Sequence, residues 1–92
     1  KPKKHPNMPE ISRFLGIVLS MFYNEHNPPH FHARYGEFKI SVEIETGTIT
    51  GDFPKRAERA VLDWLDLHKQ ELMRDWHLAS IDQPLRKIKP LE

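Results

Sequence analysis

The sequence contains no cysteine, and its 92 residues include no apolar run near the length of a membrane-spanning helix. The absence of cysteine excludes disulfide scaffolds and thiolate chemistry and fits a reducing compartment. A membrane helix needs about 20 apolar residues, whereas the longest apolar run, residues 17–23, is interrupted by Ser20. No apolar signal segment follows the basic N-terminus. We therefore expect a cytoplasmic protein without a membrane partner.

An excess of basic charge is also lacking. The chain has 14 Lys and Arg residues against 13 Asp and Glu residues, and Lys1, Lys3 and Lys4 account for three of the cations. The remaining chain is slightly acidic, so a wide nucleic-acid-binding face is not expected. The four glycines are scattered, which excludes a glycine-rich phosphate loop, and no serine lies in a Gly-x-Ser-x-Gly motif.

The length allows one small hydrophobic core. Residues 1–7 are polar, rich in proline and without periodicity, so we expect a disordered extension or a remnant ahead of the natural start at Met8. Residues 8–92 are expected to form a single α+β domain.

The middle of the chain predicts β-strands. Residues 17–23 are apolar at nearly every position, and residues 37–45 alternate between polar and apolar side chains without a fault. Residues 48–50 are expected to form a last, short strand. Residues 30–35 also alternate, with Phe31, Ala33 and Tyr35 on one face and His30, His32 and Arg34 on the other.

The turns predict the strand register. A two-residue loop at Gly36–Glu37 pairs Phe31 with Val42 on the core side. On the outer side it places His30 opposite Glu43 and His32 opposite Ser41. A similar loop at Thr46–Gly47 would place Ile44 opposite Ile49, and a one-residue slip would break either pairing.

The rest of the chain predicts one long helix from Pro54 to about Ala79, with a break near His68. Its apolar stripe has three- and four-residue spacing, and a following tail can dock through three aliphatic residues, Leu85, Ile88 and Leu91. The expected fold is an antiparallel meander of about four strands packed on this C-terminal helix in two layers. Trp64 and Trp76 are expected in the core, and His68 as a buried histidine beside them.

Three of the six histidines fall within seven residues, at His26, His30 and His32. Neutral imidazoles gathered on one face are typical of a transition-metal site, with zinc as the first choice. Imidazole can also act as a general base or acid, oriented by Glu25 or Glu43. A purely structural or interaction role is the third interpretation.

The outer face offers further polar side chains around these histidines. Arg34 would stabilise phosphate charge beside His30 and His32 as catalytic residues, with Ser41 and Glu43 as neighbours. Lys39 lies on the same face, so phosphate or an RNA backbone can bind there. Acidic residues dilute this patch, at Glu37, Glu43 and Glu45.

Several segments together resemble the domain of unknown function family 4160, a small bacterial, archaeal and phage-associated family. The segments are MPEISRFLGI at residues 8–17, HNPPHFHARYGE at residues 26–37, IETG at residues 44–47 and PLRKI at residues 84–88. The resemblance covers residues 8–91 and implies no established activity. The family's recurrent residues correspond to His26, Pro28, Pro29, His30, Phe31, His32, Tyr35 and Gly36, to which the family assigns no catalytic role.

The resemblance also implies a partner. Family members are often encoded beside another small family of unknown function, number 2442, in an arrangement similar to a toxin–antitoxin operon. The first hypothesis is therefore the toxin-like half of a two-protein module, which binds a small cognate protein through an open sheet edge. The second is a histidine-based ribonuclease or phosphoesterase. The third is a zinc-binding domain that uses His26, His30 and His32.

Overall fold

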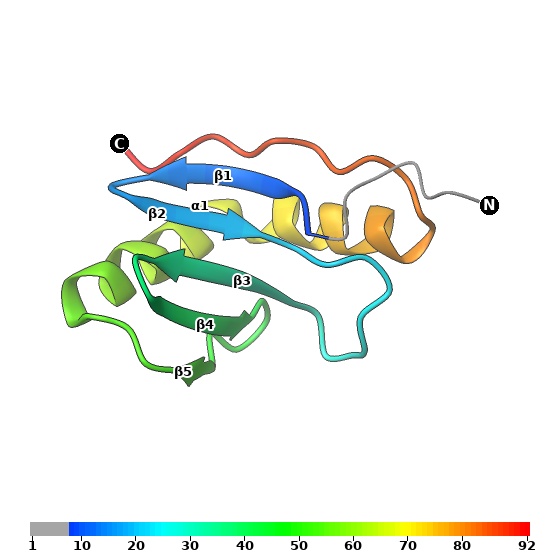
Figure 1. Cartoon of the computed structure of the whole chain (residues 1–92). Helices are drawn as coiled ribbons and strands as arrows, with labels where there is room; N and C mark the ends of the chain where they lie inside the picture. Colours follow the sequence, from blue (N-terminus) through cyan, green and yellow to red (C-terminus); the bar gives the residue numbers. More distant parts are fainter. Residues whose placement is uncertain (1–7) are drawn as a thin grey trace.

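The described part of the chain, residues 8–92 of this computed structural model, forms five antiparallel strands and one long helix (Figure 1). The strands are β1 (Glu10–Phe14), β2 (Ile17–Ser20), β3 (His30–Tyr35), β4 (Phe38–Glu43) and β5 (Ile49–Gly51), and they neighbour one another in chain order. The helix α1 (Lys55–Ser80) follows them. The expected α+β meander is confirmed, with one strand more than predicted. The expected extension over residues 1–7 lies outside the described residues.

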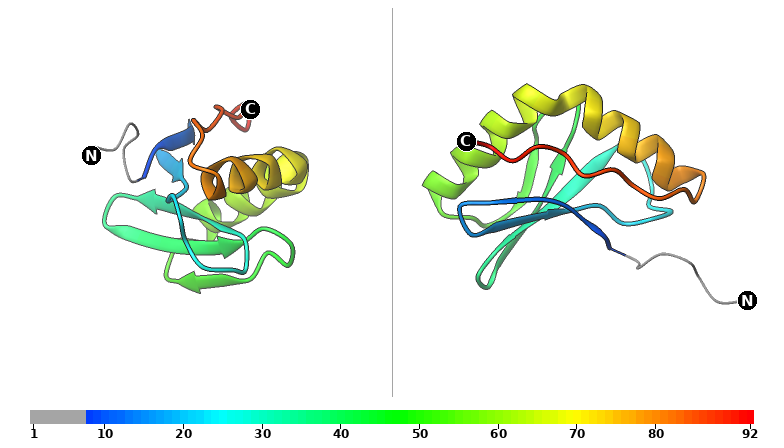
Figure 2. Two further views of the ribbon diagram at one scale, coloured as in Figure 1. Left: turned by 90° about the vertical axis from the view of Figure 1, so that its right-hand side faces the viewer. Right: turned by 90° about the horizontal axis from the view of Figure 1, so that it is seen from above.

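Helix α1 covers one face of the sheet and leaves the other face without a helix (Figure 2). Trp64 is fully buried between the layers, and its ring lies 5.6 Å from the ring of Phe14 and 5.6 Å from that of Phe31. These aromatic contacts stabilise the two-layer arrangement. Among the described residues no helix is long and apolar enough to cross a membrane.

The register of the first predicted hairpin is confirmed. Phe31 pairs with Val42, His32 with Ser41 and His30 with Glu43. The backbone N–H of Ile44 also donates to the carbonyl of Pro29, at 3.0 Å, which extends the pairing beyond the strand ends. Apolar side chains thereby remain on the side of α1 along both strands.

The register predicted for the second hairpin is wrong by two residues. Ile49 pairs with Val42 instead of Ile44, because residues 44–47 form a four-residue loop. Gly47 closes this loop with φ +77° and donates its N–H to the carbonyl of Glu43 at 2.9 Å. A shift of two residues returns the same face to the core, so the apolar pattern is satisfied in either register.

Strand β1 was not predicted, because its sequence does not alternate. The register shifts between Glu10 and Ser12, and this irregularity leaves both Ile11 and Ser12 buried. Such a bulge places two consecutive side chains outside the regular two-residue repeat.

The predicted helix is confirmed over Lys55–Ser80, and so is its break. His68 has non-helical angles, φ −124° and ψ 24°, and its Nδ1 contacts a carboxylate oxygen of Glu71. The ring of His68 is partly buried, 5.7 Å from the ring of Trp64. The kink lets the second half of α1 follow the twisted sheet toward the end where β3 begins (Figure 2).

The tail after α1 runs back along β1, as Figure 1 shows. The N–H of Ile88 donates to the carbonyl of Ile11 at 2.8 Å, and Trp64 Nε1 donates to the carbonyl of Lys89 at 2.9 Å. Ile88 is buried, and Leu85 and Leu91 pack against the core. The docking of the tail is confirmed. It covers the β1 edge of the sheet, which leaves the short β5 as the exposed edge.

A buried carboxylate holds the start of this tail. Asp75 is fully buried, and its Oδ1 accepts the backbone N–H of Arg86 at 3.1 Å. Arg74 also contacts Oδ1, at 3.3 Å, while Oδ2 has no hydrogen-bond partner among the described residues. Burial raises the pKa of Asp75, and these donors only partly oppose the increase.

Replacing Ile88 with alanine tests the contribution of the tail to the core. We expect a loss of about 2–4 kcal/mol in the free energy of unfolding, because a fully packed aliphatic side chain is removed. Leu67→Ala is the matched control, since Leu67 is 68% exposed, and should change stability by less than about 0.5 kcal/mol. Urea denaturation measures both, and equal stabilities would contradict the docked tail.

Candidate functional site

A glutamate and two histidines converge where β2 ends and β3 begins. Glu25 Oε1 lies 2.6 Å from His30 Nε2 and 3.1 Å from His32 Nε2. His30 and His32 are alternate residues of β3 and point to the face opposite Phe31 and Ala33. Their side chains are 18% and 26% exposed, and that of Glu25 is 32% exposed, so water reaches the cluster from one side.

The loop between β2 and β3 places Glu25 over the histidines. Asn24 adopts φ +59°, a left-handed conformation that asparagine tolerates, and this turns the chain back toward β3. The carbonyl of Pro28 then accepts a hydrogen bond from His30 Nδ1 at 2.8 Å. The loop therefore fixes both sides of the His30 ring.

The Pro28 contact determines which nitrogen of His30 carries a proton. A carbonyl oxygen can only accept, so Nδ1 must be the donor. In the neutral ring, Nε2 then presents a lone pair to the Glu25 carboxylate at 2.6 Å, which is repulsive. Either a proton or a cation between Nε2 and Oε1 removes this repulsion. The geometry suits a histidinium–carboxylate pair or a bound metal ion.

Aromatic side chains flank the cluster on both sides. The ring of His30 lies 5.2 Å from that of Trp76 on α1, and the ring of His32 lies 4.7 Å from that of Phe22. Trp76 is thus partly buried against the site as well as against the core. The sequence predicts that His30 lies on the open face of the sheet. In the structure its ring contacts Trp76 of α1, so His30 is less exposed than that prediction implies.

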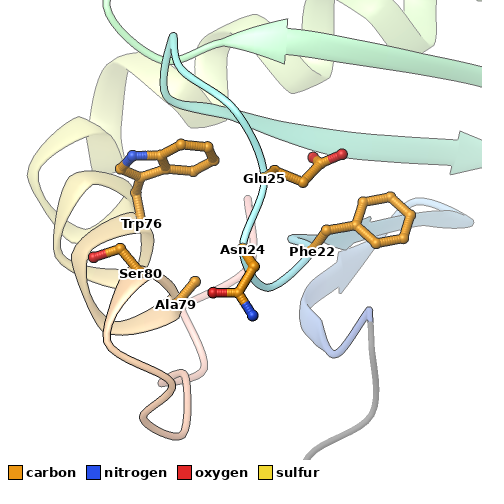
Figure 3. Close-up of a pocket in the computed structure, with 6 residues that line it drawn as sticks. All are labelled: Phe22, Asn24, Glu25, Trp76, Ala79 and Ser80. Atoms are coloured by element: carbon orange, nitrogen blue, oxygen red, sulfur yellow. The ribbon is translucent and has the colours of Figure 1, made fainter.

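A hollow of about 250 Å³ adjoins Glu25 on the side of the helix end. Figure 3 shows Trp76 and Ser80 on one side of the loop, and the Glu25 carboxylate pointing to the other side with Phe22. Polar residues, Asn24, Glu25 and Ser80, line this hollow together with Phe22, Trp76 and Ala79.

Opposing influences act on the pKa of Glu25. Partial burial raises this pKa, but hydrogen bonds from His32 and His30, together with their charges, lower it by a larger amount. The net effect is a lowered pKa, so the cluster favours the ionised carboxylate. An ionised carboxylate is the form that binds a cation.

Among the described residues, Glu25, His30 and His32 are the group whose ligand atoms gather tightly, all within 4.8 Å of one another. Zinc bonds of about 2.0–2.1 Å at tetrahedral angles place neighbouring donors roughly 3.3 Å apart. The 3.1 Å distance from Glu25 to His32 already fits this spacing. The shorter distance to His30 would have to lengthen by about 0.7 Å for zinc to bind.

The structure brings together only part of the predicted constellation. His26 is exposed and does not belong to the group, and the neighbouring Glu25 occupies the place expected for it. Of the two carboxylates considered for orienting a histidine, Glu25 makes the contact. Glu43 lies opposite His30 in register but accepts a hydrogen bond from Thr46 Oγ1 at 3.1 Å.

The other predicted neighbours lie around the site. Ser41 pairs with His32 across β3 and β4, and Arg34 is exposed two residues further along β3. Asp75 was not singled out from the sequence. Its position three residues after Leu72, on the apolar stripe, was the available signal that this carboxylate is buried.

The lowered pKa of Glu25 predicts a pH-dependent contribution to stability. The carboxylate stabilises the fold above its unfolded pKa of about 4.5, and this contribution disappears as the pH falls through the lowered folded value. Metal-free wild type should therefore be more stable than Glu25→Gln at pH 6, and the difference should shrink progressively as the pH falls below 4.5. Denaturant unfolding over this range measures it, and a constant difference would contradict the contacts described.

Comparison with known protein families identifies the family of this chain. The model of a domain of unknown function, DUF4160, matches residues 16–77, which include the loop and strand that carry Glu25, His30 and His32. No curated protein and no solved structure matched the chain. Because the match covers more than half of the sequence, the chain belongs to the DUF4160 family.

Proposed function

We propose that Glu25, His30 and His32 bind one divalent transition-metal ion, with zinc as the expected ion, and that this is the functional centre of the chain. The observation that carries the proposal is the contact of one carboxylate oxygen with both Nε2 atoms while the backbone holds the far side of the His30 ring. This set of three ligands is the histidine site predicted from the sequence with Glu25 in place of His26.

The surroundings of His30 support this proposal. Metal-binding histidines commonly donate their second ring nitrogen to a backbone carbonyl, which orients the ring and increases its basicity. The contact from His30 Nδ1 to Pro28 has this form. Two histidines and one carboxylate are also a donor set that zinc and iron accept.

With Glu25, His30 and His32 as its protein ligands, a bound zinc ion would remain open to water or a substrate. Three protein ligands are typical of catalytic zinc sites, whereas structural sites have four protein ligands. The partial exposure of the cluster and the adjoining hollow provide access to the cluster. A metal ion held by Glu25, His30 and His32 would supply hydrolytic chemistry by lowering the pKa of a water molecule bound to it.

A metal-free acid–base site is the second candidate. The 2.6 Å distance between His30 Nε2 and Glu25 Oε1 is short enough for a charge-assisted hydrogen bond. In that form Glu25 orients His30, and one histidine accepts a proton while the other donates one. This is the histidine-based ribonuclease or phosphoesterase, with Arg34 as the expected phosphate contact.

The biological role that fits either chemistry is the toxin-like half of a two-protein module in the cytoplasm. The operon arrangement that the family resemblance implies motivates this role, and a group of exposed apolar side chains at the hairpin end of the sheet supports it. Leu15, Tyr35 and Phe38 are 71%, 39% and 46% exposed there, which offers apolar surface to a small cognate partner.

Metal titration tests the proposed site. Protein prepared without a histidine tag should bind about one equivalent of zinc, and saturation at 100 times Kd should stabilise the fold by about 2.7 kcal/mol. Single alanine substitutions of Glu25, His30 or His32 should weaken binding at least tenfold. Calorimetric titration and thermal melting measure both effects.

His26→Ala and His77→Ala are the matched controls for this titration. Both remove an exposed histidine outside the cluster, so zinc affinity should be unchanged. A loss of affinity in His26→Ala equal to that in His30→Ala would favour the ligand set predicted from the sequence instead. Absence of zinc binding to the wild type would reject the metal site and leave the acid–base candidate.

Growth assays test the toxin-like role. Expression of this chain alone should slow growth, and the double substitution His30→Ala and His32→Ala should restore it, because both candidate chemistries require these rings. Co-expression of the protein encoded beside it should also restore growth, and the two products should copurify. Full inhibition by the double variant, or two products that do not associate at micromolar concentrations, would contradict the module.

A further inference from the structure

The helix-free face of the sheet carries a groove of about 300 Å³ that begins at His32. Its charged and polar lining includes three cations, Arg13, Arg34 and Lys39, together with Glu10 and Ser20. Phe22 stands at the end near the candidate metal site. His32 and Phe22 therefore belong both to this groove and to the surroundings of Glu25. The groove is continuous with the site.

The strand register aligns the cations of the groove in one row. Arg13 on β1 pairs with Val18 on β2, Val18 pairs with Arg34 on β3, and Arg34 pairs with Lys39 on β4. Strands lie about 4.8 Å apart, so the row is roughly 14 Å long. This length exceeds that of a single phosphate group and suits an extended ligand.

Two of the three cations in this row, Arg34 and Lys39, form no ion pair within the described residues. Arg34 and Lys39 face each other directly, an arrangement of like charges that destabilises a sheet. Within residues 8–92, neither side chain forms a salt bridge, whereas Arg13 is paired with Glu10 at 2.8 Å. The two central cations of the groove thus lack an anion.

His30 and His32 lie beside the row of cations, on the same face of β3 as Arg34. His32 and Arg34 are two residues apart on β3 and share a face, so their Cα atoms are separated by about 6.8 Å. A ligand whose anionic group contacts Arg34 and Lys39 can therefore extend to the Glu25–His30–His32 cluster. Phe22 adds an aromatic surface at the same end of the groove.

We propose that this groove binds the phosphodiester backbone of a short single strand of nucleic acid. Single strands are recognised by cationic grooves together with aromatic side chains on which bases stack. The few cations disfavour a duplex, which needs a larger basic face. Binding requires the groove alone, and the assignment of the strand as substrate rests on the proposed metal site.

Fluorescence anisotropy with an end-labelled oligouridylate of about ten nucleotides tests the groove. The double substitution Arg34→Ala and Lys39→Ala should weaken binding at least tenfold at low salt. It should also reduce the slope of log K against log salt concentration by about 1.4, since each neutralised phosphate of a single strand contributes about 0.7. Lys55→Ala and Arg59→Ala, exposed cations on α1, form the control that removes the same charge.

Equal weakening by the control, no binding by the wild type, or equal binding of a duplex of the same length would overturn the inference. Zinc titration of the groove variant separates it from the metal proposal, because Arg34 and Lys39 do not belong to the ligand cluster. Retained zinc binding with lost oligonucleotide binding supports two distinct parts of one site. Oligonucleotide binding without zinc binding would reject the metal site and leave the groove.

Discussion

The two-residue repeat of β3 constrains the whole molecule, because this one strand supplies both core and candidate site. Phe31 and Ala33 are almost completely buried on the side of α1, so His30 and His32 must point the other way. A one-residue slip would expose Phe31, whose burial is worth about 1.5–3 kcal/mol, and would place imidazoles against Trp64. The hydrophobic effect therefore positions the polar cluster as firmly as it forms the core.

The elements that the sequence predicted well are those with regular local patterns. The β3–β4 register followed from a two-residue turn between alternating strands, and the helix followed from its apolar stripe, including the break at His68. The docked tail followed from the spacing of Leu85, Ile88 and Leu91. In each case the local conformational preference and the packing of the core favour the same structure, so the sequence pattern was enough to predict it.

The elements that escaped prediction depend on irregular backbone. Strand β1 was hidden by its bulge, and the second hairpin contains a loop whose register differs by two residues without any change of face. At the site, Glu25 and His26 are neighbours in a loop without periodicity, and the left-handed conformation of Asn24 decides which one faces His30. The sequence analysis chose His26 because histidine is the commonest metal ligand. The path of the loop instead places the carboxylate of Glu25 against His30.

The way the sheet ends has a consequence for solubility. The irregular tail, anchored by Ile88 to the backbone of Ile11, caps the first strand without offering a further row of hydrogen-bonding groups. The opposite border is only three residues long and finishes at Gly51. Fibril growth by strand stacking needs a long, flat row of unpaired amides at both borders of each subunit. The covered first border and the short second border both limit such stacking, while the polar face of the sheet stays open.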